Sequence, residues 1–268
     1  MARGSRLKAQ GIALTVAVLL GATCSVLAAQ WLDYPAPGIP KKADGTPNLD
    51  APAPRAADGH PDLSGIWRPE RNQKCPADGC PDNQMSEQFL DFGYGLKDGL
   101  PYQPWAAALV KERSDQNGKD DPTSHCLPGG IIRLHTYPAM NKIVQTPGLI
   151  VVLSERETTY RQIFLDDRPL PADPLPTWKG YSVGTWEGDT LVVRSSGFRS
   201  EGIWLDRKGS PLTEAASITE RFRRVNVGLM EVEVTVNDPK AYTRPFTTTL
   251  SEYLVPTGEL LDFICLEN

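Results

Sequence analysis

Trp178 to Phe198, with the sequence WKGYSVGTWEGDTLVVRSSGF, is the stretch that decides the fold. Two β-type runs, Tyr181 to Trp186 and Thr190 to Ser195, flank Glu187-Gly188-Asp189. A short connection that contains glycine between two such runs is a strong signal for a β-hairpin. The sequence therefore predicts an antiparallel hairpin at this point.

Further β-type runs lie on both sides of this hairpin, at 131–134, 142–145, 149–154, 158–165, 218–225, 230–236, 246–254 and 260–266. In the run 230–236 the residue types alternate, which puts Met230, Val232, Val234 and Val236 on one face of a strand. Counted from Trp67, about nine or ten short strands with hairpin-length links predict a mainly β fold. We expect an antiparallel up-and-down barrel or a closely related sandwich.

Gly65-Ile66-Trp67 forms a G-x-W motif where the ordered domain begins. The motif resembles the opening of lipocalins and related calycin barrels, in which the tryptophan closes one end of the barrel. This resemblance implies a lipocalin-like barrel.

A larger set of motifs extends over residues 61–268. The motifs are DPxxxCLPxG at 121–130, KIVQTP at 142–147, RQIFLD at 161–166, WxGYSVGxWEGDTLVV at 178–193, TERF at 219–222, DPKAYTxP at 238–245 and CxEN at 265–268. Taken in this order, they resemble an uncharacterised family of exported bacterial proteins. The resemblance implies export and supplies no activity.

The N-terminus has the features of a Sec-type secretory signal. Arg3, Arg6 and Lys8 precede an apolar run at 11–20, and Val26-Leu27-Ala28 resembles a cleavage site. The apolar run is short for a membrane span, which needs about 20 residues, so we favour a cleaved signal over an anchor. We therefore expect a periplasmic or secreted bacterial protein with no transmembrane anchor after cleavage.

The remaining chain divides by composition into a leader and one domain. Residues 1–29 form the predicted signal peptide, and 30–60 form a leader rich in proline and alanine that we expect to be flexible. Residues 61–268 form a single β domain with a loop-rich insertion at 68–120. Within the insertion a short helix is predicted at 104–114, and one or two short helices are expected overall. The sequence gives no oligomeric state.

Charge argues against nucleic acid as a partner. Removal of residues 1–29 takes away three basic and no acidic residues, which changes the formal net charge from −5 to −8. Nucleic-acid binding needs a basic surface, and no cluster of lysine and arginine provides one.

Four cysteines, Cys75, Cys80, Cys126 and Cys265, remain after the predicted signal. An even number in an exported chain favours two disulfides over a metal site, since this spacing fits no common zinc motif. The turn-forming sequence between Cys75 and Cys80 suggests that these two pair locally. Cys126 would then pair with Cys265 and close a loop of about 140 residues.

Motifs for nucleotide binding and for zinc proteases are absent from the sequence. It contains no P-loop, G-x-G-x-x-G or H-E-x-x-H, and we expect neither a cofactor nor a metal ion. His125 and His135 flank Cys126, and together with a carboxylate such as Glu220, Glu155 or Asp189 they are weak candidates for acid–base chemistry. The alternative is that both histidines lie in surface loops or bind backbone groups.

Glu220 and Arg221 are adjacent in a predicted strand, so one of them should face the interior. A buried ion pair and a contact to a ligand are both compatible with that position.

We interpret the chain as a binding protein that holds a small, partly apolar or amphipathic molecule in a barrel cavity. The candidate ligand-binding residues are Arg161, Trp178, Tyr181, Trp186, Trp204 and Arg221. Aromatic rings that alternate along a barrel wall can line an apolar pocket, although they more often fill a core. Two alternatives stay open: a barrel-type hydrolase, lyase or isomerase that uses a carboxylate and a histidine, and a structural or interaction module without a pocket.

Overall fold

A computed structural model describes residues 34–70, 92–93 and 96–267. The predicted signal and the predicted pair Cys75–Cys80 lie outside these residues. The chain divides into two units, residues 1–35 with 257–259 and residues 36–256 with 260–268. In the first unit the amide of Gly258 donates to the carbonyl of Tyr34 at 2.8 Å, and Pro35 forms a β-bridge with Thr257. All that follows concerns the second unit.

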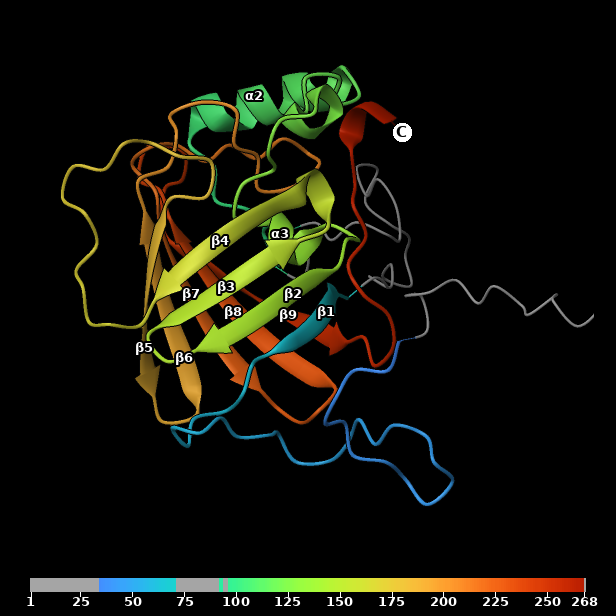
Figure 1. The fold of residues 1–268 in the computed structure, drawn as a ribbon. Coiled ribbons are helices and arrows are strands. Elements are labelled where there is room, and N and C mark those ends of the chain that lie inside the picture. The colour runs from blue at the N-terminus through green and yellow to red at the C-terminus, as the bar shows by residue number, and fades with distance from the viewer. Residues whose placement is uncertain (1–33, 71–91, 94–95, 268) are drawn as a thin grey trace, which may run out of the picture. The chain divides into compact units, whose positions relative to one another are not determined.

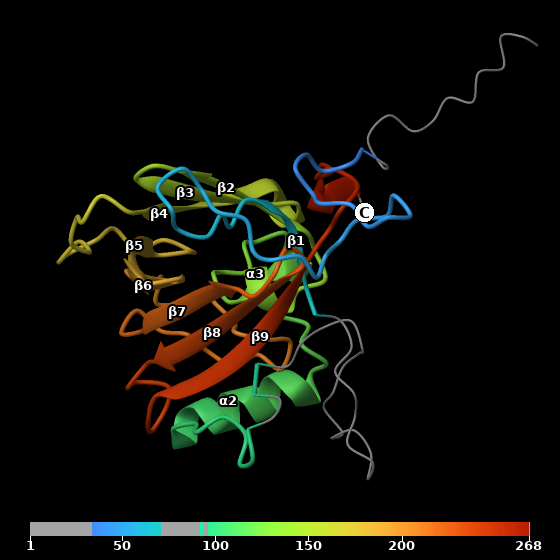
Figure 2. The same cartoon turned by 90° about the horizontal axis from the view of Figure 1, so that it is seen from below.

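Nine strands of the described chain form a closed barrel in which sequence neighbours are also spatial neighbours (Figures 1 and 2). They are β1 (Gly65–Pro69), β2 (Asn141–Thr146), β3 (Leu149–Ser154), β4 (Thr159–Phe164), β5 (Tyr181–Glu187), β6 (Thr190–Ser196), β7 (Ser217–Arg224), β8 (Leu229–Asn237) and β9 (Phe246–Leu254). The mainly β prediction and the barrel are confirmed, and the sandwich alternative is not. The hairpin predicted at 181–195 is β5–β6.

One neighbouring pair, β4 and β5, runs parallel, whereas the other pairs run antiparallel. A ring of strands that alternate in direction must contain an even number of them. With nine strands, one parallel pair is needed if β1 and β9 are to close the barrel as antiparallel neighbours, as they do. A parallel pair cannot be joined by a tight turn. Residues 165–180, the crossing loop, provide the longer connection along the outside of the barrel (Figure 1).

The barrel wall follows the predicted alternation. Met230, Val232, Val234 and Val236 of β8 are fully buried, and each such side chain contributes roughly 1.5–3 kcal/mol relative to exposure. Trp67 of the G-x-W motif is also fully buried, and its indole nitrogen donates to the carbonyl of Leu63 at 3.0 Å. Apolar residues from all parts of the ring therefore share one core.

Two α-helices of the described residues accompany the barrel. The helix predicted at 104–114 is α2 (Pro104–Asp115), which lies outside the strands, with the indole of Trp105 donating to the carbonyl of Lys240 at 2.8 Å. The second helix, α3 (Arg133–Thr136), lies inside the ring of strands (Figures 1 and 2). No helix in the described part of the chain is long and apolar enough to cross a membrane.

Two predicted strands were wrong. The run 131–134 is the entry to α3 rather than a strand, because a short apolar run is compatible with either structure once it is buried on all sides. The run 260–266 is extended chain that ends in a 3-10 turn at Cys265–Glu267. At that point β9 already pairs with both β8 and β1, so the closed barrel offers no free edge to a further strand.

The expected flexible leader makes specific contacts in its part that belongs to the second unit, residues 36–60. The amides of Val227 and Gly228 donate to leader carbonyls at 2.9 and 2.8 Å. Arg55 donates to both carboxylate oxygens of Asp189 at 2.6 and 2.7 Å, and the ring of His60 stacks on Trp186 at 4.7 Å. This segment is therefore held against the β5–β6 and β7–β8 turns.

Candidate functional site

The barrel interior contains a cluster of buried charged and hydroxyl side chains, which we call the interior cluster. Its members are His135 of α3, Arg161 of β4, Ser182 of β5, Ser195 of β6, Glu220 of β7 and Glu252 of β9. All six are at most 5% exposed. Glu220 faces the interior and Arg221 the outside, in agreement with the prediction that one of these adjacent residues faces inward.

His135 lies between two carboxylates. Its Nδ1 is 2.5 Å from Oε1 of Glu252, and its Nε2 is 2.8 Å from Oε1 of Glu220. Arg161 binds the same Glu220 from the other side, through Nη1 at 2.9 Å and through Nη2. A protonated His135 donates both of its N–H groups, so the two positive and two negative charges of the interior cluster balance.

Two serines complete the cluster. Arg161 donates from Nε to Oγ of Ser182 and from Nη2 to Oγ of Ser195, both at 3.1 Å, and the two hydroxyl oxygens are 2.8 Å apart. Buried charges persist when their hydrogen bonds are satisfied and their charges are matched, and both conditions hold here. The cluster links α3 to five strands of the barrel.

The interior cluster changes the pKa of its members. Burial by itself would lower the pKa of His135, but hydrogen bonds to Glu220 and Glu252 outweigh burial and raise it to about 9. Burial by itself would raise the pKa of Glu220, but the charge of Arg161 and the hydrogen bonds from His135 and Arg161 lower it to about 2. At neutral pH the histidine is therefore charged and Glu220 is ionised.

This arrangement suits structural support better than catalysis. Both ring nitrogens of His135 are engaged by carboxylates, and both oxygens of Glu220 are bound. A general base must reach the proton of its substrate, and the His135 side chain is only 5% exposed. The interior cluster therefore holds α3 in the barrel.

The parallel junction between β4 and β5 opens the barrel wall. The pairing covers only Ile163 and Phe164 against Ser182 and Val183. The part of the crossing loop that precedes β5 lies away from β4. There the amide of Thr177 donates to the carbonyl of Gly197, the residue after β6, at 3.0 Å. The first half of β4 therefore has no strand beside it on this side.

A glycine allows this path. Gly180 has a φ of +64°, and a Cβ placed on it would lie 2.6 Å from the carbonyl oxygen of Ser196. The close approach to β6 draws the chain away from β4. Lys179, next to it, spans the opening and donates to the hydroxyl of Thr159 at 2.7 Å.

The opening forms a groove of about 750 Å³, which we call the seam groove. Its aromatic lining residues are Tyr160, Phe164, Trp178 and Tyr181, and its basic ones are Arg161, Arg168 and Lys179. Pro128, Pro169 and Pro171 add rigid apolar surface. Among the described residues that line the groove, none is acidic. Arg161 and Ser182 belong to both the groove and the interior cluster, so these two residues connect the lining of the groove to the cluster.

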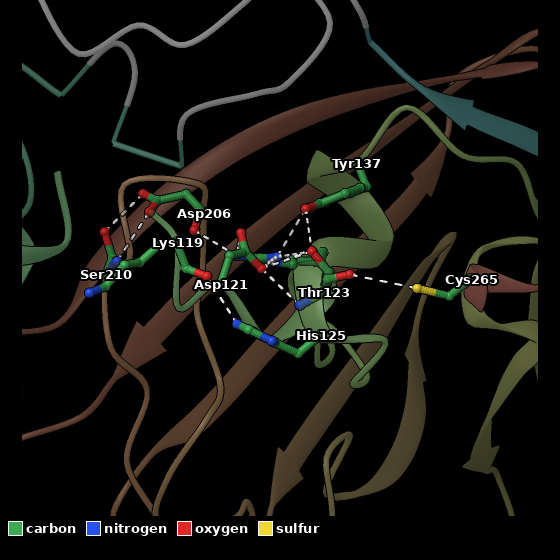
Figure 3. Close-up of polar contacts among 9 residues, drawn as sticks. Lys119, Asp121, Thr123, His125, Tyr137, Asp206, Ser210 and Cys265 are labelled. Carbon is green, nitrogen blue, oxygen red and sulfur yellow. Dashed lines mark hydrogen bonds and ion pairs between the residues drawn. The ribbon is translucent and has the colours of Figure 1, made fainter. Parts of the chain in front are cut away.

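A second buried ion pair lies next to α3. Arg133 donates from Nη1 and Nη2 to the two carboxylate oxygens of Asp121 at 2.7 and 2.9 Å. Figure 3 shows Asp121, Thr123 and Tyr137 turned toward one another, and the hydroxyls of Thr123 and Tyr137 are 2.8 Å apart. Burial would raise the pKa of Asp121, but the hydrogen bonds and charge of Arg133 keep it below its ordinary value. The pair fixes the chain that leads into α3.

The predicted disulfide between Cys126 and Cys265 is present, with the two sulfur atoms 2.10 Å apart. It attaches the C-terminal segment to the loop before α3. His125 lies beside it, and its Nε2 is 3.0 Å from the carbonyl oxygen of Lys119 (Figure 3). Of the two candidate histidines, His125 thus binds a backbone group, and His135 lies within hydrogen-bond reach of Glu220.

The structure brings three of the six predicted ligand-binding residues together. Arg161, Trp178 and Tyr181 line the seam groove. Trp186 stacks on a histidine of the leader at the β5–β6 tip. Trp204 is buried under the guanidinium group of Arg113, and Arg221 pairs on the outer surface with Glu187 at 3.0 Å. These last three lie away from the groove.

Sequence reasoning missed Glu252, Ser182 and Ser195. Each occupies an inward position of an alternating strand; Glu252, for example, follows Leu250 and precedes Leu254 at spacings of two. A charged residue in the apolar register of a strand was the available signal for Glu252. Within the described residues, no group of three or more histidine, cysteine, aspartate or glutamate side chains is arranged to hold a metal ion.

Comparison with family models, with curated proteins and with solved structures gave no match for this chain. The resemblances to exported bacterial proteins and to lipocalins therefore stay predictions, and function rests on the geometry of the site.

Proposed function

We propose that this chain is an exported protein that binds a small, partly apolar molecule in the seam groove between β4 and β5. The observation that carries the proposal is the groove itself, about 750 Å³ in volume and lined by aromatic rings and prolines. Binding sites for small molecules are typically concave, mostly apolar and about 300–1,000 Å³ in volume. Export is supported by the signal-like N-terminus and by the disulfide, because disulfides persist in oxidising compartments.

The proposed site differs from the cavity that a lipocalin-like barrel implies. The centre of this barrel is occupied by α3 and the interior cluster. The groove lies in the wall, where the wall strands separate. The proposed ligand would therefore enter from the side of the barrel and rest against Trp178 and Tyr181.

Acid–base catalysis is the second function considered. Its support is the distance of 2.8 Å between Nε2 of His135 and Glu220. Catalysis also requires a nitrogen that can face a substrate, and both nitrogens of His135 already bind carboxylates. Binding is therefore the better supported function, and the groove equally favours it over an interaction module without a pocket.

The test is titration of the purified protein with N-phenyl-1-naphthylamine, a neutral aromatic probe whose fluorescence rises when it leaves water. We expect one probe per chain and a loss of affinity of at least about tenfold in the double variant Trp178→Ala/Tyr181→Ala, the loss expected for two aromatic contacts. Trp105→Ala is the matched control, because Trp105 is a half-exposed tryptophan on α2 outside the groove.

Absence of one-to-one binding to the wild-type protein, or equal losses in the groove and control variants, would overturn the proposal. Native mass spectrometry of protein purified from its own host provides an independent measurement, since a bound molecule adds a defined mass to the chain.

A further inference from the structure

A small cavity between α3 and the start of β2 is lined by two residues that each have an unpaired polar atom. These atoms are Nε of Arg133 and Oδ1 of Asn141, and neither has a hydrogen-bond partner among the described residues. From these atoms and the size of the cavity we infer a binding site for one ordered water molecule, which accepts from Arg133 and donates to Asn141. The inference does not depend on ligand binding in the seam groove.

Arg133 is the donor of the site. Its Nη1 and Nη2 groups donate to the carboxylate of Asp121 at 2.7 and 2.9 Å, and Nη2 also donates to the carbonyl of Asp206 at 2.9 Å. These bonds hold the guanidinium group in place, and its Nε–H remains without an acceptor in the described part of the chain. A buried donor normally has a partner, and an unpaired one lowers stability.

Asn141 is the acceptor of the site. Its Nδ2 donates to the carbonyl of Leu134 at 2.7 Å. This bond fixes the orientation of the amide, because the reverse orientation would place two acceptor oxygens against each other. Arg133 and Asn141 are each only 4% exposed, so bulk water does not satisfy their unpaired atoms. A partner for both atoms must therefore lie in the cavity.

The cavity has the size of one water molecule. The space in which the centre of a water molecule can lie is about 10 Å³. A buried water needs about 10–15 Å³ on this measure and typically makes about three hydrogen bonds. Ser154 also lines the cavity, and it lies directly opposite Asn141 in the β2–β3 pair, so the two side chains share one face of the sheet. Its hydroxyl provides the third partner.

The chemistry of the lining favours water over an ion. A metal ion would lie against the cationic guanidinium group of Arg133. An anion would lie against the acceptor oxygen of Asn141, and the charge of Arg133 is already matched by Asp121. Water both accepts and donates, which is what one N–H and one carbonyl oxygen together require.

The water would extend the attachment of α3 to the barrel. The interior cluster connects α3 to β4, β5, β6, β7 and β9. Asn141 connects it to β2 through the carbonyl of Leu134. A water bound to Arg133, Asn141 and Ser154 adds β3, and it joins the buried ion pair of Arg133 to the barrel wall.

A crystal structure of the wild-type protein, at a resolution that shows ordered waters, is the first test. We expect one density peak within about 3.2 Å of both Nε of Arg133 and Oδ1 of Asn141. In solution, the same water should give a cross-relaxation peak between the water resonance and the Nε proton of Arg133, because a buried water exchanges far more slowly than a surface water.

Ser154→Thr is the second test, since threonine suits a strand and its added methyl group is similar in size to a water molecule. We expect the methyl group to displace the water. The unfolding equilibrium constant should then rise about tenfold, because a donor and an acceptor are left unpaired. Ser251→Thr is the matched control, because Ser251 is a partly exposed serine of β9 that does not line the cavity. It should keep the water and change the constant by at most about twofold.

Three results would overturn the inference. The first is a wild-type map without the peak, or with a peak bonded to only one of the two atoms. The second is a direct contact between Nε of Arg133 and Oδ1 of Asn141. The third is a Ser154→Thr variant as stable as the wild type or more stable, because filling a dry cavity adds packing contacts without loss of hydrogen bonds.

Discussion

Glu252→Gln tests the interior cluster through the pH dependence of stability. In the wild-type protein His135 has a pKa of about 9 in the folded state, against 6.5 for an unperturbed histidine. Because the folded pKa is the higher one, the stabilisation is fully present below pH 6.5 and is lost as the pH rises through 9. At about 1.4 kcal/mol per pH unit, this contribution is about 3 kcal/mol.

The variant should remove most of this dependence. Glutamine keeps the shape of the side chain, and its amide can donate to Nδ1 of a neutral His135 while Nε2–H still donates to Glu220. One of the two carboxylates that raise the histidine pKa is then gone, whereas burial, which lowers it, remains. We expect Glu252→Gln to lower the free energy of unfolding below pH 6.5 and to lose less than about 1.5 kcal/mol between pH 6.5 and 9.

The assay is urea unfolding followed by tryptophan fluorescence at a series of pH values from 6.5 to above 9. Glu231→Gln is the control, since Glu231 is a partly exposed glutamate of β8 that pairs with Arg223 on the surface. It should cost at most about 1 kcal/mol and keep the wild-type pH profile. Identical pH profiles for Glu252→Gln and the wild-type protein would refute the assignment of a charged His135 between two carboxylates.

Three further perturbations have defined outcomes in denaturant unfolding. Cys126→Ser/Cys265→Ser should lower the free energy of unfolding by about 5 kcal/mol on the chain-entropy account, because the two cysteines are 139 residues apart. Gly180→Ala should cost more than about 2 kcal/mol, since its Cβ meets a carbonyl oxygen of β6, whereas Gly188→Ala, which has φ +61° but open space, should cost about 1 kcal/mol. Arg133→Met should cost about 3–5 kcal/mol, because it leaves a buried carboxylate without its cation.

For each of these predictions, one experimental outcome would contradict it. A disulfide variant within about 1 kcal/mol of the wild type would show that the long loop adds little. Equal costs at the two glycines would remove the role of the close approach to β6. For the ion pair, addition of Asp121→Asn to the arginine variant should recover part of the loss, and no recovery would contradict the charge argument.

Local patterns predicted the wall of the barrel well. The hairpin β5–β6 follows from turn chemistry between two β-type runs, and the buried face of β8 follows from strict alternation. The same rule predicted that one of Glu220 and Arg221 faces inward, but it did not say which, and Arg221 was among the expected ligand-binding residues. The pairing of Cys126 with Cys265 followed from cysteine count and spacing. In each case the deciding information lies within a few residues of sequence or in a simple count.

The features that the sequence did not predict depend on residues that are far apart in the chain. Nothing in the run 131–134 indicates that it enters the barrel, since α3 is fixed by Glu220 and Glu252, which lie 85 and 117 residues away from His135. The parallel junction of β4 and β5 likewise follows from closure of nine strands, a property of the whole ring. The seam groove arises from that junction and could not be placed before the strand order was known.

The crossing loop and the disulfide together determine whether a single proteolytic cleavage in the loop separates the chain into two fragments. The loop at 165–180 divides the chain into a fragment with β1–β4 and a fragment with β5–β9, and Cys126 and Cys265 lie on opposite sides of it. Protein nicked once in this loop should therefore migrate as one species without reductant and as two with it. The same division suggests that the two halves, expressed as separate polypeptides, could reassemble and be joined covalently on oxidation.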